Sequence, residues 1–150
     1  MTNARIGYGA QFYMQATSVA AVLTKLGEVT SIGLPNEQRG EAEATHFESP
    51  GQTREYIATL IDGGELPVTI NWIPGDATDD LIVAAKASGS RLIMRTVVPG
   101  GQQFTYPGIV KGIEREMPID DRMTATITIR VAGAVVQEEV FADPTDIEEA

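Results

Sequence analysis

Few side chains in this sequence have the type and spacing needed for catalysis. His46 is the only histidine, and the chain contains no cysteine. A catalytic triad would have to be built around His46, yet the chain has no Gly-x-Ser-x-Gly sequence to present a nucleophilic serine. A single histidine on an alternating strand is usually a partly exposed sheet residue. We therefore expect His46 to act neither as a base nor as a metal ligand.

Three aspartates close together could suggest a metal site. Asp76, Asp79 and Asp80 follow a Pro-Gly pair, but they lack the spacing of a calcium-binding loop. They do suit the start of a helix. Asp76 is an N-cap residue whose carboxylate can accept from amides of the first turn, and the helix dipole favours the other two.

Glu114 and Glu116 share one face of an expected strand and could imitate a carboxylate pair. Arg115 between them faces the other side, so a solvated sheet face is the simpler interpretation. The sequence around Gly7 and Gly9 is too short for a nucleotide loop, and no Gly-Lys-Ser/Thr follows it. The sequence predicts a protein that is not an enzyme and needs no metal or cofactor.

One convincing helix is expected, near residues 77–88. Leu81, Ile82 and Ala85 fall on one face at helical spacing, Lys86 suits the last turn, and Gly89 is a C-terminal stop. The rest of the chain alternates between strands and turns. We expect a mainly β fold, a β-sandwich or barrel of about seven or eight strands with one flanking α-helix.

The expected strands follow from alternation and turn residues. They cover residues 21–32, 40–47, 54–61, 66–73, 91–98, a partner that begins at 102, 109–116 and 123–131. Residues 62–64 (Asp-Gly-Gly) are expected to form a hairpin turn, and residues 99–101 (Pro-Gly-Gly) end the strand before the next hairpin. The clearest alternation lies in 123–131 and points four apolar side chains inward: Ala125, Ile127, Ile129 and Val131.

Length and charge limit the possibilities further. A chain of 150 residues is most simply one domain that hides about 68–70% of its unfolded surface. Its net charge is −10, and six of its 21 acidic residues lie in the last 14 residues, which contain no Lys or Arg. Such a charge argues against gripping phosphate backbones, although acidity also simply keeps proteins soluble.

No apolar signal or membrane-length segment is present, so we expect a soluble, cytoplasmic chain. We divide it into an N-terminal arm (1–20), a β-sandwich domain (21–136) and an acidic C-terminal tail (137–150).

The order of these features resembles the major tail tube protein of long-tailed, non-contractile (siphovirus, phage-lambda-like) bacteriophages. The resemblance rests on the WIPGD junction at residues 72–76 before the helix and the Pro-Gly-Gly hairpin. It also rests on residues 106–133, where an aromatic residue, a Gly-containing strand, a turn and a Thr-rich alternating strand follow one another. It covers most of residues 21–133, and we expect no immunoglobulin-like domain of the kind that some relatives append.

The resemblance implies a structural virion protein with the tail-tube fold. Hexameric rings would join their sheets around a channel and stack into a tube, through which phage DNA passes without specific binding. Expected partners are other copies of the chain and the tape-measure, tail-terminator and baseplate or tip proteins. The implied location is the virion tail, assembled in the host cytoplasm, with no membrane contact.

Two groups of residues are candidates for roles in such a tube. Glu41 and Glu43 could form an acidic row facing the lumen, or they could simply face solvent on an ordinary sheet. Contacts between rings are assigned to the N-terminal arm, whose aromatics have no obvious place in a core, and to the loop 47–56. The candidate residues are Tyr8, Phe12, Tyr13, Phe47, Arg54 and Tyr56.

Three alternatives stay open. A tail terminator or related single-ring tube or baseplate protein would share the fold. A small acidic β-barrel that binds an apolar ligand would be a monomer with an enclosed pocket. An enzyme is the most distant alternative, because no catalytic site is visible.

Overall fold

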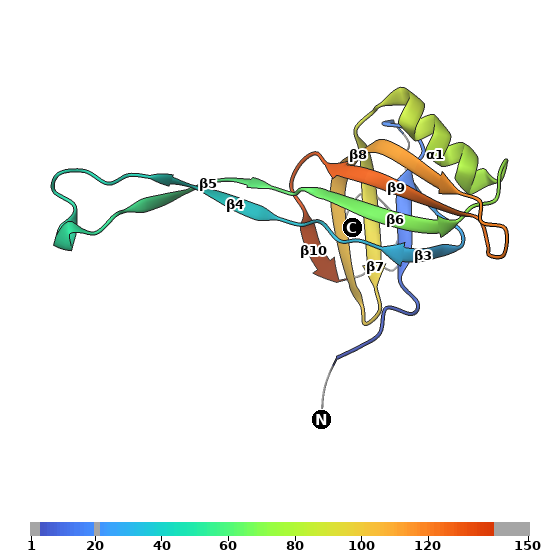
Figure 1. Ribbon diagram of the computed structural model, residues 1–150, viewed down its shortest axis with the longest axis horizontal. Helices are drawn as coiled ribbons and strands as arrows, with labels where there is room; N and C mark the ends of the chain where they lie inside the picture. The colour runs from blue at the N-terminus through green and yellow to red at the C-terminus, as the bar shows by residue number, and fades with distance from the viewer. Residues whose placement is uncertain (1–3, 20–21, 140–150) are drawn as a thin grey trace.

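The computed structural model describes residues 4–19 and 22–139 and has a mainly β architecture with one helix, as the sequence predicted. Eight strands form one sheet in the order β2-β1-β7-β8-β9-β6-β3, with β10 beside β8, and β4 and β5 form a separate pair (Figure 1). The strands are β1 (Gln11–Gln15), β2 (Leu23–Lys25), β3 (Val29–Ile32), β4 (Gln38–Glu43), β5 (Tyr56–Asp62), β6 (Glu65–Asn71), β7 (Leu92–Val98), β8 (Gln102–Glu116), β9 (Thr124–Val131) and β10 (Val136–Glu139).

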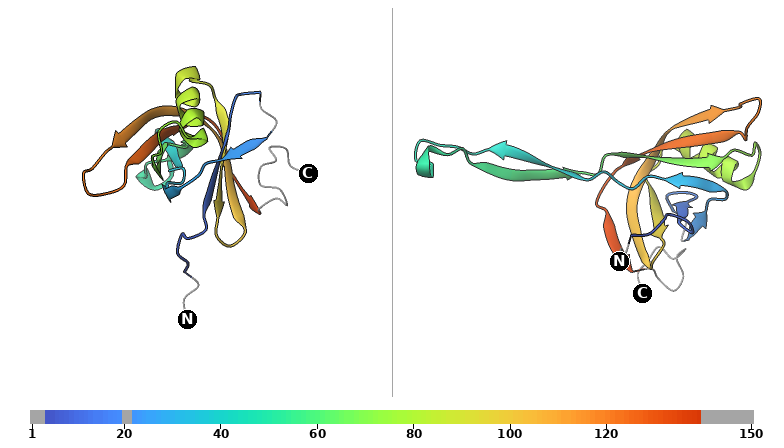
Figure 2. Two further views of the ribbon diagram at one scale, coloured as in Figure 1. Left: turned by 90° about the vertical axis from the view of Figure 1, so that its right-hand side faces the viewer. Right: turned by 60° about the horizontal axis from the view of Figure 1, so that its bottom comes forward.

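The large sheet curls around a single core. β2 and β3 follow each other in the chain but lie at opposite ends of the strand order, and β3 also contacts β1. The sheet therefore almost closes on itself, as the two views in Figure 2 show. The buried core draws on most of its strands and the helix and includes Phe12, Met14, Leu66, Val68, Ile82, Met94, Tyr106, Ile127 and Ile129.

The helix α1 (Ala77–Ser88) lies where the sequence placed it. Gly89 adopts a left-handed conformation (φ 62°), and its amide donates to the carbonyl of Ala85. Glycine adopts this conformation without steric cost, so it ends the helix as predicted. The helix buries Ile82 and Ala85 and packs against β8.

The start of the helix differs from the prediction in one respect. Within the described residues, Asp76 is the N-cap by position but makes no side-chain capping hydrogen bond. Asp79 ties the junction together, because its carboxylate accepts from the Trp72 indole N–H at 3.0 Å and from the Gly75 amide at 3.1 Å. The guanidinium of Arg115 lies 5.4 Å above the Trp72 ring, a favourable cation–π distance.

The predicted strand over residues 21–32 is two strands. Leu26 is buried, and the chain turns at Gly27 and Glu28, where Glu28 has a positive φ of 53°. The Gly27 amide donates to the Thr78 hydroxyl. This turn sends β2 to one edge of the sheet and β3 to the other, so one continuous strand is not possible.

The predicted N-terminal arm is too long. β1 lies inside the large sheet, where it pairs with β7 on one side and β2 on the other. Among the described residues of the predicted arm, only 4–10 and 16–19 lie outside strands. At the other end, β10 pairs with β8 and takes in the first residues of the predicted acidic tail. The rest of that tail, residues 140–150, lies outside the described residues.

The Asp-Gly-Gly sequence at residues 62–64 is not a hairpin turn. β5 pairs with β4, whereas β6 pairs with β3 and β9, so these residues join two different sheets. A β-carbon on Gly63 would lie 2.4 Å from Cγ1 of Val131, and Gly64 has a φ of 72°. Both glycines are therefore needed where the chain passes from β5 into the large sheet, which with the helix forms the body of the molecule. The predicted Pro-Gly-Gly hairpin is confirmed, since Val98 pairs with Gln102 across it.

Candidate functional site

The most unusual part of the molecule is the ribbon, which we define as residues 38–62: β4, β5 and the segment between them. It projects well away from the large sheet (Figure 1). Every residue of β5 is exposed, and so are all residues of β4 except the half-buried Ala42. The ribbon thus differs from the large sheet, where most strands contain buried residues.

The two faces of the ribbon differ in chemistry. Residues paired directly across antiparallel strands share a face, and the register shifts between Arg39 and Glu41, which leaves Thr59 and Leu60 both opposite Gly40. One face, here called the apolar face, therefore carries Ala42, Ile57, Thr59 and Leu60. The other, the charged face, carries Arg39, Glu41, Glu43, Tyr56, Ala58 and Ile61.

The apolar face presents large side chains to solvent. Leu60 is 89% exposed and Ile57 is 57% exposed. Contiguous exposed apolar surface on a soluble protein usually marks a contact site. A two-stranded hairpin alone is also only marginally stable in water. The ribbon therefore has the features of a surface that another molecule completes.

Glu41 and Glu43, the candidate lumen residues, lie on the charged face of the ribbon. Both are exposed, and a Glu43 carboxylate oxygen lies 4.0 Å from Nε of Arg54. They belong to the two-stranded sheet and not to the large one. Their orientation toward a channel stays a prediction, since it depends on how copies assemble.

The tip of the ribbon brings together a histidine, a serine and a glutamate. Nδ1 of His46 lies 2.7 Å from Oγ of Ser49, and that hydroxyl donates to the Glu55 carboxylate at 2.7 Å. The sequence did not predict this group, and its histidine lies in the tip, beyond the end of β4, not on a strand. Phe47 beside it is fully exposed.

This arrangement is unsuited to nucleophilic catalysis. In a catalytic triad the histidine lies between the serine and the acid, whereas here the serine lies between the other two. The Ser49 hydroxyl donates its hydrogen bond to Glu55, and His46 is largely open to solvent whereas Glu55 is half-buried. The three residues instead hold the tip in one conformation.

The aromatic residues assigned to the arm separate into two groups. Tyr8 is 89% exposed, but Phe12 and Tyr13 are 0% and 4% exposed on β1. The premise that they have no place in a core is wrong for Phe12, which belongs to the hydrophobic core. Tyr13 is buried on the other face of β1, where its hydroxyl donates to Gln11 at 2.6 Å. Only Tyr8 of the three stays available for contact with another molecule.

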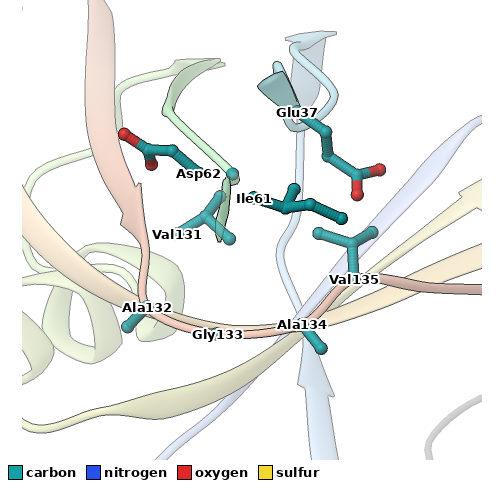
Figure 3. A pocket seen from close by; sticks show the side chains of 9 residues that line it. Glu37, Ile61, Asp62, Val131, Ala132, Gly133, Ala134 and Val135 are labelled. Carbon is teal, nitrogen blue, oxygen red and sulfur yellow. The ribbon is translucent and has the colours of Figure 1, made fainter. Parts of the chain in front are cut away.

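An open notch of about 560 Å³ lies at the root of the ribbon. Figure 3 shows Glu37 and Asp62 at its sides, with Ile61, Val131 and Val135 between them. This is the kind of surface that a protein segment can occupy; an apolar ligand would require a more enclosed site.

The carboxylate of Asp62 holds the root together. It accepts from the Gly64 amide at 2.9 Å and from the Arg130 guanidinium at 2.9 and 3.1 Å. The hydrogen bond from the Gly64 amide, followed by that from Arg130, lowers the pKa of Asp62 below its ordinary value of 3.8.

A second exposed apolar group lies in the turn between β8 and β9, which the sequence analysis did not single out. Met117 and Ile119 are 72% and 99% exposed there. This turn and the ribbon lie at opposite ends of the molecule (Figures 1 and 2). The signal available in the sequence was apolar residues inside an otherwise polar turn.

Two kinds of site can be excluded for the part of the chain that the structure covers. Among the described residues, no group of three or more His, Cys, Asp or Glu side chains could hold a metal ion. The same residues contain no helix with the length and apolar character required to cross a bilayer.

Similar folds occur in phage tails and related particles. The tail of an empty gene transfer agent (GTA) particle, refined with C6 symmetry, has a chain that is 14% identical with a TM-score of 0.71, covering 89% of this chain and 98% of that one. The SPP1 tail tube is 15% identical with a TM-score of 0.69, covering 94% and 82%. A chain of the anti-feeding prophage baseplate is 6% identical with a TM-score of 0.69, covering 93% and 99%.

A comparison with curated protein sequences found no match. The family described as the lambda phage tail tube protein matches residues 9–137, which run from β1 to the first half of β10 and include the whole ribbon. The chain therefore belongs to the lambda phage tail tube protein family.

Proposed function

We propose that six copies of this chain form a ring, that rings stack into the tail tube, and that phage DNA passes through the tube into the host cell. The observation that carries the proposal is the ribbon, with an apolar face that the subunit's own described residues leave open. The sixfold symmetry of the similar GTA tail and anti-feeding prophage baseplate supports the number six.

The proposal follows from the energetics of the ribbon. Burial of apolar surface stabilises by about 25 cal/mol per Å², and Ile57 and Leu60 gain little of it in a single subunit. A neighbouring copy can bury the apolar face and complete the ribbon. Ring assembly thus provides what the isolated chain lacks.

Stacking is supported by the two exposed ends of the molecule. The ribbon lies at one end, and the turn between β8 and β9, which contains the exposed Met117 and Ile119, lies at the other. Contacts between different surfaces of identical subunits extend without closing, as a tube of stacked rings requires. We assign the contacts between rings to Tyr8, Phe47, Arg54 and Tyr56.

Charge supports a channel for DNA. The chain carries 21 acidic and 11 basic residues, and a surface poor in Lys and Arg gives DNA little phosphate affinity. We keep Glu41 and Glu43 as candidates for an acidic row along the lumen. In the same proposal, tape-measure, terminator and baseplate proteins bind the tube, and assembly takes place in the host cytoplasm.

Electron microscopy of the purified protein over a range of concentrations tests the assembly. Stacked rings with sixfold symmetry are expected at high concentration. Single rings that never stack would favour a tail terminator, a role also filled by this fold in the cap of the anti-feeding prophage. Uniform monomers at every concentration would contradict the proposal and favour a binding module.

The lumen assignment needs its own test. Glu41→Lys combined with Glu43→Lys should slow DNA ejection from assembled particles, because twelve added cations per ring would bind phosphates, whereas tube formation should persist. The matched control is Glu114→Lys with Glu116→Lys, two exposed acids on β8 of the body. Equal ejection by both variants and the native chain would remove Glu41 and Glu43 from the lumen.

A further inference from the structure

An open groove of about 320 Å³ lies between the helix and β8, and we call it the α1–β8 groove. Val83 and Ala87 of α1 and Ile113 of β8 form its apolar part. It lies beside the half of β8 that extends past β7, because β7 pairs with β8 only as far as Gly108. A site of this size is at the lower end of the range for small-molecule pockets, so it suits one or two inserted side chains.

The groove is also positively charged. Lys86 and Arg115 line it beside the apolar side chains, and neither makes an ion pair among the described residues. Arg115 lies over the Trp72 ring, whereas Glu114 and Glu116 on either side of it point to the opposite face of the strand. Two unpaired cations beside apolar surface, in a chain of net charge −10, favour an acidic occupant with an apolar side chain.

The tip of the ribbon has these properties. Phe47 is fully exposed, and the adjacent Glu48 is exposed and makes no ion pair among the described residues. The hydrogen bonds of Ser49 with His46 and Glu55 hold the tip in one conformation. Phe47 is therefore presented to a binding surface with little further loss of conformational entropy. Aromatic side chains that fill small pockets are typical anchors of protein interfaces.

The tip lies far from the groove of its own subunit, since the ribbon and α1 are at opposite ends of the molecule (Figures 1 and 2). We propose that Phe47 of one copy inserts into the α1–β8 groove of a neighbouring copy and places Glu48 beside Lys86. The Phe47 ring then gains apolar burial and a cation–π contact with the groove.

Each copy offers both a tip and a groove. A contact between two different surfaces of identical subunits repeats along an assembly. The inference rests on the proposed tube, and it identifies the surface that receives the ribbon.

Cross-linking between copies tests the contact directly, because the native chain contains no cysteine. The full-length variants Glu48→Cys and Ala87→Cys are mixed, assembled and treated with a short thiol–thiol cross-linker. Both positions are exposed in the single subunit, so each variant should fold. A cross-linked dimer that contains one copy of each variant is expected in the tubes. The matched control replaces Glu48→Cys by Glu41→Cys, farther from the tip on β4, and should give no such dimer.

Reversal of the charges gives a second measurement. At low salt, Glu48→Lys and Lys86→Glu should each raise the protein concentration needed for tubes about fivefold, because each places like charges at the contact. The chain that carries both changes should assemble at nearly the native concentration. Glu41→Lys combined with Lys86→Glu is the control and should show no recovery. Equal defects in the single and combined variants would overturn the pairing of Glu48 with Lys86.

The inference and the proposed tube can fail separately. Normal tubes that give no cross-link between positions 48 and 87 would overturn the docking of Phe47 in the groove and leave the tube intact. A native chain that stays monomeric at every concentration would overturn both.

Discussion

β9 and β5 are similar in composition but lie in opposite surroundings. In β9 the inward side chains Ala125, Ile127, Ile129 and Val131 are 0–5% exposed, whereas in β5 the four large apolar side chains Tyr56, Ile57, Leu60 and Ile61 are 52–89% exposed. β9 lies between β8 and β6, whereas β4 is the only strand among the described residues that pairs with β5. Apolar residues on a strand thus predict a contact surface, but they do not indicate whether the contact is made within the chain or with another molecule.

This contrast separates two kinds of stability in one molecule. The body obtains its burial within the subunit. The ribbon has its hydrogen-bonded pairing and its tip network, but its large apolar side chains are exposed in the single subunit, and in the proposed assembly another copy buries them. Changes in the body should therefore affect folding of the single chain, and changes in the ribbon should affect assembly.

The largest effect is expected from charges on the apolar face. Ile57→Asp with Leu60→Asp should abolish tube formation, because buried unpaired carboxylates would destabilise each subunit contact. The monomer should stay folded, since both side chains are already exposed. Electron microscopy and sedimentation would measure the loss. Ala58→Asp, on the charged face, is the control and should assemble, and normal tubes from the double variant would show that the apolar face is not an interface.

A smaller but measurable contrast is expected in the stability of the monomer. Ile129→Ala should lower the free energy of unfolding by about 2–5 kcal/mol, because it leaves a cavity in the core. Leu60→Ala should change it by no more than about 0.5 kcal/mol, as for ordinary surface substitutions. Urea unfolding at low protein concentration compares the two directly. Similar losses in both variants would mean that the ribbon is buried within its own subunit.

The parts of the fold that the sequence predicted are those specified by local chemistry. The helix is bounded by the Pro-Gly stop before Asp76 and by Gly89 after it, and β9 has an uninterrupted alternation. The apolar residues of residues 21–32 gave no indication of the turn at Glu28. That turn depends on tertiary contacts, among them the hydrogen bond from Gly27 to Thr78.

The sequence indicated that some candidate residues are exposed but did not indicate that others are buried, because burial also depends on tertiary contacts. Phe47, in the tip, and Tyr56, the first residue of β5, are exposed as an interface requires, but Phe12 fills the core. An aromatic residue near the N-terminus carries no local mark of whether its strand joins the sheet. The glycines at 63 and 64 are equally typical of a hairpin turn and of a passage between two sheets. The need for glycine at position 63 comes from its close approach to Val131, a tertiary contact that the local sequence does not show.

The smallest expected effect concerns the root, where body and ribbon meet. The pKa of Asp62 is lowered by the Gly64 amide and by Arg130, so the ionised carboxylate stabilises the folded root. Since the folded-state pKa lies below the unfolded value, this stabilisation is present above about pH 4 and disappears as the pH falls through the lower, folded-state pKa.

Asp62→Asn keeps an oxygen that can accept from Gly64 but removes the charge. The unfolding midpoint of the native chain should therefore exceed that of Asp62→Asn slightly at pH 6, and the two should converge as the pH approaches 2. A second variant, Lys111→Met, removes the exposed ion pair between Lys111 and Glu65, which also lies near the root. Lys111 lowers the pKa of Glu65, so this variant shows how much of the pH dependence comes from Glu65. A difference between the native chain and Asp62→Asn that persists unchanged at pH 2 would mean that shape, not charge, joins the ribbon to the body.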